Sequence, residues 1–308
     1  MNKIYLIVVL LISSGFLGAL TMKGNDNNDL SSKNIIGNIK SLIETSYSAV
    51  VDTGMVEKDS LRLILTTRYN EMGNLTEETE QNQFGDVITR STYAYDIVGN
   101  LILKQSYNSK GTPEDRNCYT YDKSGHLMED DLFKSDNSLV LKIINRYNVS
   151  GQQIERDSYR SDGSLFIRSV YNYDKSDNQI EEINYDEEGH LDSKSSFKYD
   201  NSGNKIEENI YNSDGNLFRK NSYRYDYSGK VTERCTYYPW GSLINKVTYR
   251  FDDKGNQKEE DHFKSDGTLA VKTTFFYSET DKRGNWLKMV KFENEKPVEI
   301  TRRDLEYY

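Results

Sequence analysis

Aromatic residues return every 26 positions through most of the chain, and this period organises its hydrophobic pattern. Nine aromatics share one phase without an insertion: Tyr69, Tyr95, Tyr121, Tyr147, Tyr173, Tyr199, Tyr225, Phe251 and Tyr277. Two positions earlier, and so on the same strand face, lie Tyr93, Tyr119, Tyr171, Phe197, Tyr223, Tyr249 and Phe275. A third series comprises Tyr107, Phe133, Tyr159, Tyr185, Tyr211, Tyr237 and Phe263. No stretch of the repeat shows a sustained 3.6-residue apolar period, so the pattern predicts strands.

Glycines mark two turns in each unit. Four residues after the first eight aromatics come Gly73, Gly99, Gly125, Gly151, Asp177, Gly203, Gly229 and Gly255, and twelve residues later come Gly85, Gly111, Asn137, Gly163, Gly189, Gly215, Gly241 and Gly267. Asp177 and Asn137 are of the types that best tolerate a positive φ, so both phases predict left-handed turn positions. The fold class that follows is all-β: a repetitive antiparallel sheet or solenoid of hairpins, open or curled, with two strands per 26-residue unit and about 18–20 strands.

Charged residues form two further rows at half the period. Acidic residues share one phase, which comprises Glu77, Glu129, Glu155, Glu181, Glu207, Glu233 and Glu259. Basic residues lie thirteen positions after that phase: Arg90, Arg116, Lys142, Arg168, Lys194, Lys220, Lys246 and Lys272. Folding each unit about its turn places the two rows opposite each other. One exposed pair contributes about 0–1 kcal/mol, so we expect the rows mainly to fix the strand register.

The ends of the chain differ from the repeat. Residues 1–22 predict a secretory signal peptide, because Lys3 precedes an apolar run and small residues follow. We assign residues 23–32 to a disordered spacer, 33–64 to an N-terminal capping unit that starts with a short helix over Ile35–Ser46, 65–283 to the repeats and 284–308 to a C-terminal capping hairpin. The signal predicts an extracytoplasmic protein, in the periplasm, on the cell surface or secreted. An uncleaved membrane anchor over Ile4–Leu20 is the alternative, and the lack of a cysteine before Cys118 argues against a lipoprotein.

Composition narrows the possible functions. Hydrophobic residues make up 35% of the 308 residues, but aromatics reach 12%, which a disordered chain does not carry. The 40 Lys and Arg against 49 Asp and Glu give a net charge of −9, which argues against a nucleic-acid partner. Cys118 and Cys235 lie 117 residues apart, so a disulfide would require the sheet to curl back on itself. The three histidines, His126, His190 and His262, share no ligand spacing, and we predict no metal and no cofactor.

The turn motif Tyr-Asp-x-x-Gly-Asn, as at residues 95–100 and 199–204 and with Phe at 251–256, resembles the YD repeats of the bacterial Rhs family. The resemblance covers about residues 65–290, and the second half-unit, Tyr211 to Leu217, is similar to MORN-type hairpins. The family implies a long β-sheet that can spiral into a shell, often around a C-terminal toxin, and YD repeats are associated with carbohydrate binding. This chain departs from the pattern in carrying Asn after the turn glycine. Its repeats continue almost to Tyr308, so we expect that it has no room for a toxin passenger.

Aromatic side chains supply the candidate binding site. Exposed Tyr and Trp rings stack on sugars or anchor protein partners, and Trp240, with neighbours Tyr237 and Tyr238, breaks the repeat in a turn where other units carry Asp or Ser. Trp286 is the other position where a larger side chain replaces the residue of the repeat. We therefore expect a non-enzymatic binding or scaffold module with a glycan or a surface protein as its partner.

Two alternatives remain. One is a β-shell component of an Rhs-type toxin system, which a closed curvature would favour. The other is a carboxylate-based glycoside hydrolase using pairs such as Glu181-Glu182, Glu207-Glu208 or Glu259-Glu260. These pairs recur in phase, as structural positions do, so we predict no catalytic residue.

Overall fold

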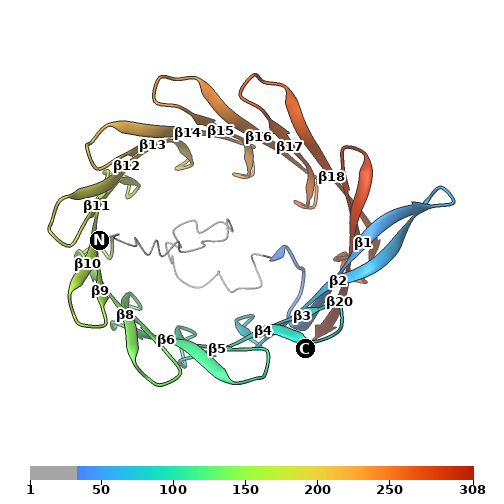
Figure 1. The fold of residues 1–308 in the computed structure, drawn as a ribbon, viewed down its shortest axis with the longest axis horizontal. Helices are drawn as coiled ribbons and strands as arrows, with labels where there is room; N and C mark the ends of the chain where they lie inside the picture. Colours follow the sequence, from blue (N-terminus) through green and yellow to red (C-terminus); the bar gives the residue numbers. More distant parts are fainter. Residues whose placement is uncertain (1–32) are drawn as a thin grey trace, which may run out of the picture.

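The turn motifs fold the chain into consecutive antiparallel hairpins, which join into one closed ring of 20 strands (Figure 1). The computed structural model describes residues 33–308, so the predicted signal peptide (1–22) and spacer (23–32) lie outside the described residues. Among residues 33–308, no helix has the length and apolar character needed to cross a membrane.

Each strand pairs with its neighbours in chain order. The first ten strands are β1 (Ile39–Asp52), β2 (Met55–Tyr69), β3 (Leu75–Asn82), β4 (Val87–Tyr95), β5 (Leu101–Tyr107), β6 (Pro113–Tyr121), β7 (Leu127–Phe133), β8 (Leu139–Tyr147), β9 (Gln153–Arg160) and β10 (Leu165–Tyr173). The second ten are β11 (Gln179–Tyr185), β12 (Leu191–Tyr199), β13 (Lys205–Tyr211), β14 (Leu217–Tyr225), β15 (Val231–Tyr237), β16 (Leu243–Phe251), β17 (Gln257–Phe263), β18 (Leu269–Thr280), β19 (Trp286–Glu293) and β20 (Lys296–Tyr307). The predicted 18–20 strands and their antiparallel pairing are confirmed.

The turns have the geometry that their residues predict. In the turn at 200–204, Asp200 Oδ1 accepts hydrogen bonds from the backbone amides of Ser202 (2.8 Å) and Asn204 (3.0 Å), and Gly203 has a φ of +82°. Asn137 (φ 66°) and Asp177 (φ 65°) occupy the same left-handed conformation without glycine. The turn aspartates therefore cap backbone amides, as expected of Asx turns.

The ring closes through its two terminal strands, which corrects the solenoid expectation. β1 pairs with β2 along one edge and with β20 along the other, from Ile39 opposite Tyr307 to Ser48 opposite Glu299. The terminal strands thus complete each other instead of capping separate edges. The predicted helix over Ile35–Ser46 is wrong, because pairing on both edges of β1 outweighs any local helical preference.

The seam between β20, β1 and β2 carries the most deeply buried apolar residues. Ile39 and Leu42 on β1 have no exposed surface, Ile300 on β20 is 1% exposed, and Tyr69 on β2 is 3% exposed. Elsewhere most strand residues are only half-buried. Burial of apolar surface therefore stabilises the closure most strongly, while the repeats depend more on hydrogen bonds and on part-buried aromatic rings.

The β1–β2 hairpin extends beyond the ring. β20 reaches β1 only as far as Ser48, and β3 reaches β2 only from Leu63, so residues 49–62 pair with one another alone. Figure 1 shows this hairpin projecting outward. Its tip exposes Val50, Val51 and Met55.

Alternate residues face opposite walls of the ring. On β14 the side chain of Arg224 is 79% exposed, whereas Tyr223 and Tyr225 beside it are half-buried. Lys198 and Arg250 stand in the same relation to their aromatic neighbours. Side chains diverge on the outside of a closed ring and converge on its inside. The exposed series therefore lies on what we call the outer wall, and the two aromatic rows that flank it on the inner wall.

Ion pairs cover the outer wall. Glu207 pairs with Lys220 at 2.6 Å and with Lys198 at 2.8 Å, and the hydrogen bonds from these two ammonium groups lower its pKa to about 2. In the register of β13 and β14, Lys220 lies opposite Asn209, which is two residues after Glu207. The ion pair between Glu207 and Lys220 is therefore diagonal across the two strands. The predicted alternation of acidic and basic rows is confirmed.

The two ends of the ring differ in width. At one end the turns of successive units touch: Lys230 Nζ donates to the carbonyl of Gly255 at 2.6 Å, and Gln152 Nε2 donates to Asp177 at 2.9 Å. We call this end, with its turns at 70–74, 96–100 and so on to 281–285, the narrow rim. At the other end, the wide rim, a Cβ added to Gly85, Gly163 or Gly215 would meet nothing within 4 Å. In Figure 1 one set of turns accordingly spreads outward and the other lies closer to the centre.

Candidate functional site

The inner wall is where the units differ from one another in charge. Nine residues after each turn aromatic, the chain carries Glu78, Lys104, Asp130, Arg156, Glu182, Glu208, Arg234 and Glu260. The acidic row of the outer wall repeats with one exception, but this neighbouring row changes sign from unit to unit. Sequence reasoning missed it, although the change of sign within an otherwise regular repeat was visible. Burial raises the pKa of Asp130 and Glu182 in this row.

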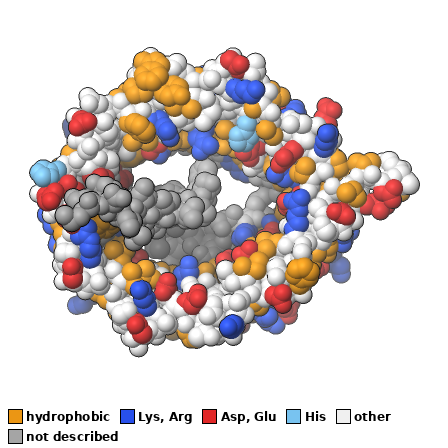
Figure 2. All heavy atoms as spheres, viewed as in Figure 1, with side chains coloured by type: hydrophobic (Ala, Val, Ile, Leu, Met, Phe, Trp, Pro, Cys, Tyr) orange, Lys and Arg blue, Asp and Glu red, His pale blue; other side chains and the backbone are white. Residues whose placement is uncertain are grey.

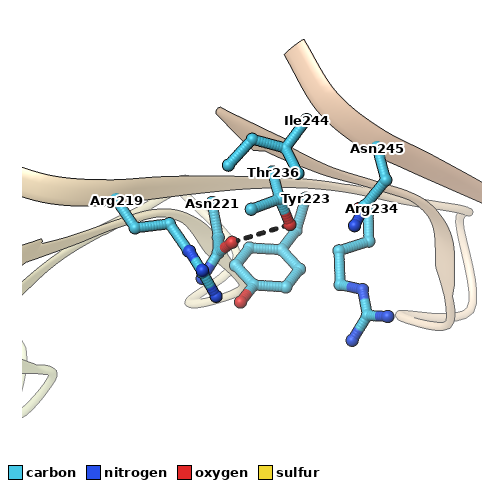
Figure 3. Close-up of a pocket in the computed structure, with 7 residues that line it drawn as sticks. All are labelled: Arg219, Asn221, Tyr223, Arg234, Thr236, Ile244 and Asn245. Atoms are coloured by element: carbon cyan, nitrogen blue, oxygen red, sulfur yellow. Dashed lines mark hydrogen bonds between the residues drawn. The ribbon is translucent and has the colours of Figure 1, made fainter. Parts of the chain in front are cut away.

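A hollow of about 330 Å³ opens on the inner wall across β14, β15 and β16. Its lining comprises Arg219, Asn221, Tyr223, Arg234, Thr236, Ile244 and Asn245. Figure 3 shows Arg219, Tyr223 and Arg234 projecting from the same side of the strands, with the tyrosine between the two arginines. The hollow thus presents two guanidinium groups on either side of an aromatic and amide floor.

A hydrogen-bond network fixes the floor of the hollow. Thr236 Oγ1 donates to Asn221 Oδ1 at 3.0 Å, and Asn221 Nδ2 donates to Glu208 Oε2 at 2.8 Å. The hydroxyl of Tyr223 donates to the same carboxylate oxygen at 2.9 Å. Burial alone would raise the pKa of Glu208, but hydrogen bonds from Asn221 and Tyr223 and the charge of Lys205 bring it below its ordinary value. Glu208 is therefore a satisfied, ionised group.

The two arginines of the hollow are different, because both are exposed and neither has a carboxylate within ion-pair distance among residues 33–308. The inner-wall carboxylates on the flanking strands have other partners. Glu208 on β13 accepts from Asn221, Tyr223 and Lys205, and Glu260 on β17 bonds to Gln257 and His262. By contrast, Arg224 on the outer wall of β14 pairs with Glu233.

A second hollow of about 630 Å³ lies at the narrow rim between the turns at 200–204 and 226–229. Its carboxylates are already engaged, since Asp200 and Asp226 each cap the backbone amides of their own turn. Tyr227 stands fully exposed beside it. The carboxylates of this second hollow are thus committed to their own turns, whereas the first hollow holds two guanidinium groups without a carboxylate partner among the described residues.

The residues predicted for binding do not form one site. Tyr238 and Trp240 do stack, with ring centroids 4.6 Å apart and planes 6° from parallel, at the wide rim, where Trp240 is 74% exposed. Tyr237 is part-buried on β15 and belongs to the outer wall, opposite Lys220. Trp286 lies at the narrow rim against Tyr277 and beneath the guanidinium of Arg303, 3.5 Å from its ring centre. Trp240 and Trp286 are thus at opposite ends of the ring.

Two further groups of titratable side chains are candidates for a metal site or a disulfide. Asp186, Glu188 and His190 place ligand atoms within 4.8 Å of one another at a wide-rim turn, but Asp186 also caps the amides of that turn. Cys118 on β6 and Cys235 on β15 are both free, nine strands apart on a ring of 20 and so nearly on opposite sides. The expectations of no metal, no cofactor and no catalytic residue stay predictions.

Comparisons with known proteins leave the family open. No family model matches the chain, and no curated protein matches it. Among solved structures, a Tc holotoxin pore from Photorhabdus luminescens aligns at 13% identity and a TM-score of 0.38, over 81% of this chain and 17% of that one. A TcdB2-TccC3-Cdc42 complex aligns at 13% identity and 0.34, over 85% and 16%. A porin-like protein from Bacteroides uniformis aligns at 11% identity and 0.34, over 87% and 96%.

This chain spans about a sixth of the length of the toxin chains that it matches. TM-scores this low carry no argument about fold or function. The resemblance to Rhs-type YD repeats therefore continues to depend on the turn motif itself.

Proposed function

We propose that this protein is a non-enzymatic shell that takes up a segment of another polypeptide in its lumen, outside the cytoplasm. The observation that carries the proposal is the closure of the sheet by β1 and β20. A closed sheet has an enclosed wall, and the expectation from sequence was that closure would favour the shell over an outward-facing binding module. Figure 2 shows an opening at the centre of the ring.

The size of the ring suits a polypeptide guest. Twenty strands about 4.8 Å apart span roughly 100 Å perpendicular to the strands, and the tilt of about 35–45° usual in closed sheets widens the ring, so the diameter between backbones is roughly 30–40 Å. Because packed sheets lie about 10 Å apart, side chains reach about 5 Å inward from each backbone, which leaves an opening on the order of 20–30 Å. An α-helix with its side chains is about 10–12 Å wide, so a helix or an extended chain fits, whereas a folded domain of ordinary size does not.

The chemistry of the two walls supports binding of a guest polypeptide to the inner wall. Carboxylates and cations of the outer wall are largely paired with each other, as at Glu207 and Glu259, each of which has two cationic partners. Such a wall suits contact with water. The inner wall instead offers unpaired guanidinium groups and amides to a guest, and the proposal assigns it binding and no catalysis.

Labelling of two neighbouring positions tests enclosure. Ser195 and Ser196 are adjacent on β12, and the register places Ser195 on the inner wall beside Glu182 and Ser196 on the outer wall beside Glu181. Each would be changed to cysteine in a chain carrying Cys118→Ser and Cys235→Ser. We expect a small maleimide to label both positions, and a maleimide on a 5-kDa polymer to label only Ser196→Cys.

Uptake is measured with the same variants. Unstructured 20-residue peptides, one acidic, one basic and one neutral, would be added before the small maleimide. The proposal expects at least one peptide to protect Ser195→Cys and none to protect Ser196→Cys. Equal polymer labelling at both positions, or no protection by any peptide, would contradict it.

Glycan binding is the second candidate, because the stacked pair Tyr238 and Trp240 exposes an aromatic face at the wide rim. A glycan array probed with the purified chain and with Trp240→Ala tests it. Binding that disappears in the variant would support sugar recognition at that turn. No binding to any glycan would remove this candidate.

A further inference from the structure

We propose that the hollow formed by β14, β15 and β16 binds the carboxylates of an acidic polypeptide segment through Arg219 and Arg234. This inference depends on the proposed function, since it names the chemistry of the guest that the inner wall takes up. It concerns a place where the inner wall carries two cations and where, among the described residues, no carboxylate lies within 4.0 Å of either guanidinium group.

The two arginines lack a carboxylate partner because the surrounding carboxylates are bonded elsewhere; the guanidinium of Arg219 lies over the Phe218 ring, 5.3 Å from its centre. Glu208 faces the hollow from β13 but is held by Asn221, Tyr223 and Lys205, and Glu260 on β17 is held by Gln257 and His262. Neither carboxylate lies within 4.0 Å of the two arginines. A guanidinium offers five donors in a planar fork that matches a carboxylate, and such charge-assisted pairs are stronger than neutral hydrogen bonds.

The floor of the hollow is already ordered for a ligand. The bonds from Thr236 to Asn221 and from Asn221 to Glu208 fix the amide, so little conformational entropy is lost there on binding. Asn245, exposed on β16 at the edge of the hollow, has both an amide donor and a carbonyl acceptor for a peptide backbone. The site thus combines two cations with peptide-compatible amides.

The aromatic rings favour a peptide over a sugar in this hollow. Sugar recognition on tyrosine needs an open ring face. The Nζ of Lys205 lies 5.3 Å from the centre of the Tyr223 ring, and the hydroxyl of that tyrosine is bonded to Glu208. One face of the ring and its polar tip are therefore already occupied, whereas the two arginines beside it have no carboxylate partner among the described residues.

Fluorescence anisotropy with a labelled 12-residue glutamate-rich peptide tests the site. The test compares the purified chain with Arg219→Gln/Arg234→Gln and with Arg224→Gln, which removes an arginine from the outer wall of the same strand. The net charge of −9 works against an acidic ligand, so binding would require a local basic site. We expect the double variant to bind at least tenfold more weakly and the control to bind within about twofold of the parent.

A charge reversal keeps the test informative if the double variant folds poorly. Arg219→Glu/Arg234→Glu is expected to lose the glutamate peptide and to gain a lysine peptide of equal length, at salt concentrations where the parent shows the opposite preference. Circular dichroism confirms that each variant retains its sheet.

The other outcomes overturn the proposal. Equal loss in Arg224→Gln would assign the effect to overall charge. Binding of an oligogalacturonate and not of the peptide would make the hollow a glycan site. If a basic or neutral peptide protects Ser195→Cys but the glutamate peptide does not bind, the shell proposal is retained and the proposed acidic-peptide site is rejected. If no peptide protects that position, the proposed function fails with it.

Discussion

At the scale of single residues, backbone conformation and paired charges explain most of the regularity of the chain. Left-handed turn positions admit glycine, asparagine or aspartate, and both exceptions to glycine adopt the same φ. The sequence was sufficient to predict these positions, because a positive φ restricts residue type wherever it occurs. It was not sufficient to predict which charges stay unpaired, since that depends on the three-dimensional bonding around Arg219 and Arg234.

Substitution of Gly163 isolates the cost of the left-handed conformation. Its φ is +82°, and an added Cβ would meet nothing within 4 Å, so no steric contact complicates the result. We expect Gly163→Ala to lower the free energy of unfolding by about 1–2 kcal/mol, and Gly163→Asn to cost less than half as much. Urea unfolding of the two variants measures this, and equal losses would contradict the turn assignment.

The pKa of Glu207 predicts a pH-dependent contribution to stability. Because its pKa in the folded chain is about 2, below the unfolded value of 4.5, the stabilisation is complete above about pH 4.5 and disappears as the pH falls through 2. We expect Glu207→Gln to cost about 1 kcal/mol at pH 7, discounted for the exposure of both lysines, and much less at pH 2. Asp214→Asn, in an exposed turn, is the control for loss of charge, and an unchanged difference at pH 2 would contradict the ion-pair account.

At the scale of strands, the turn tyrosines link successive units at the narrow rim. From Tyr95 onward, each hydroxyl donates to the carbonyl of the residue 20 positions earlier, as from Tyr199 to Gln179 at 2.6 Å and from Tyr277 to Gln257 at 2.8 Å. The 26-residue spacing made the aromatic rows and the hairpins predictable. The helix expected at Ile35–Ser46 failed because that segment has strand partners on both sides, which local sequence does not reveal.

Removal and addition of this hydroxyl give opposite predictions. Tyr199→Phe leaves the carbonyl of Gln179 without its donor and should lower the free energy of unfolding by about 1 kcal/mol. Phe251 holds the same phase without a hydroxyl, so Phe251→Tyr should stabilise the chain by up to about 1 kcal/mol through the carbonyl of Val231. Thermal or urea unfolding measures both effects, and Tyr227→Phe, at an exposed position, is the neutral control. If only packing of the ring mattered, neither Tyr199→Phe nor Phe251→Tyr would change the free energy of unfolding.

At the scale of the whole molecule, closure is the property that the repeat pattern did not determine. Identical units fit an open sheet, a spiral or a ring, and the choice depends on pairing between residues some 250 positions apart in the chain. The seam shows why a ring is favoured, since Ile39, Leu42 and Ile300 are fully buried only when β1 and β20 meet. The shell proposal and the acidic guest both require this closure.

A disulfide across the seam tests closure most directly. Ser46 on β1 and Thr301 on β20 are register partners with side-chain oxygens 3.4 Å apart. In a chain with Cys118→Ser and Cys235→Ser, we predict that Ser46→Cys/Thr301→Cys forms an intramolecular disulfide on mild oxidation, seen as a faster-migrating monomer on a non-reducing gel. Ser46→Cys/Ser196→Cys should form none. Failure of the first pair to cross-link, or cross-linking only between chains, would show an open sheet and contradict the account.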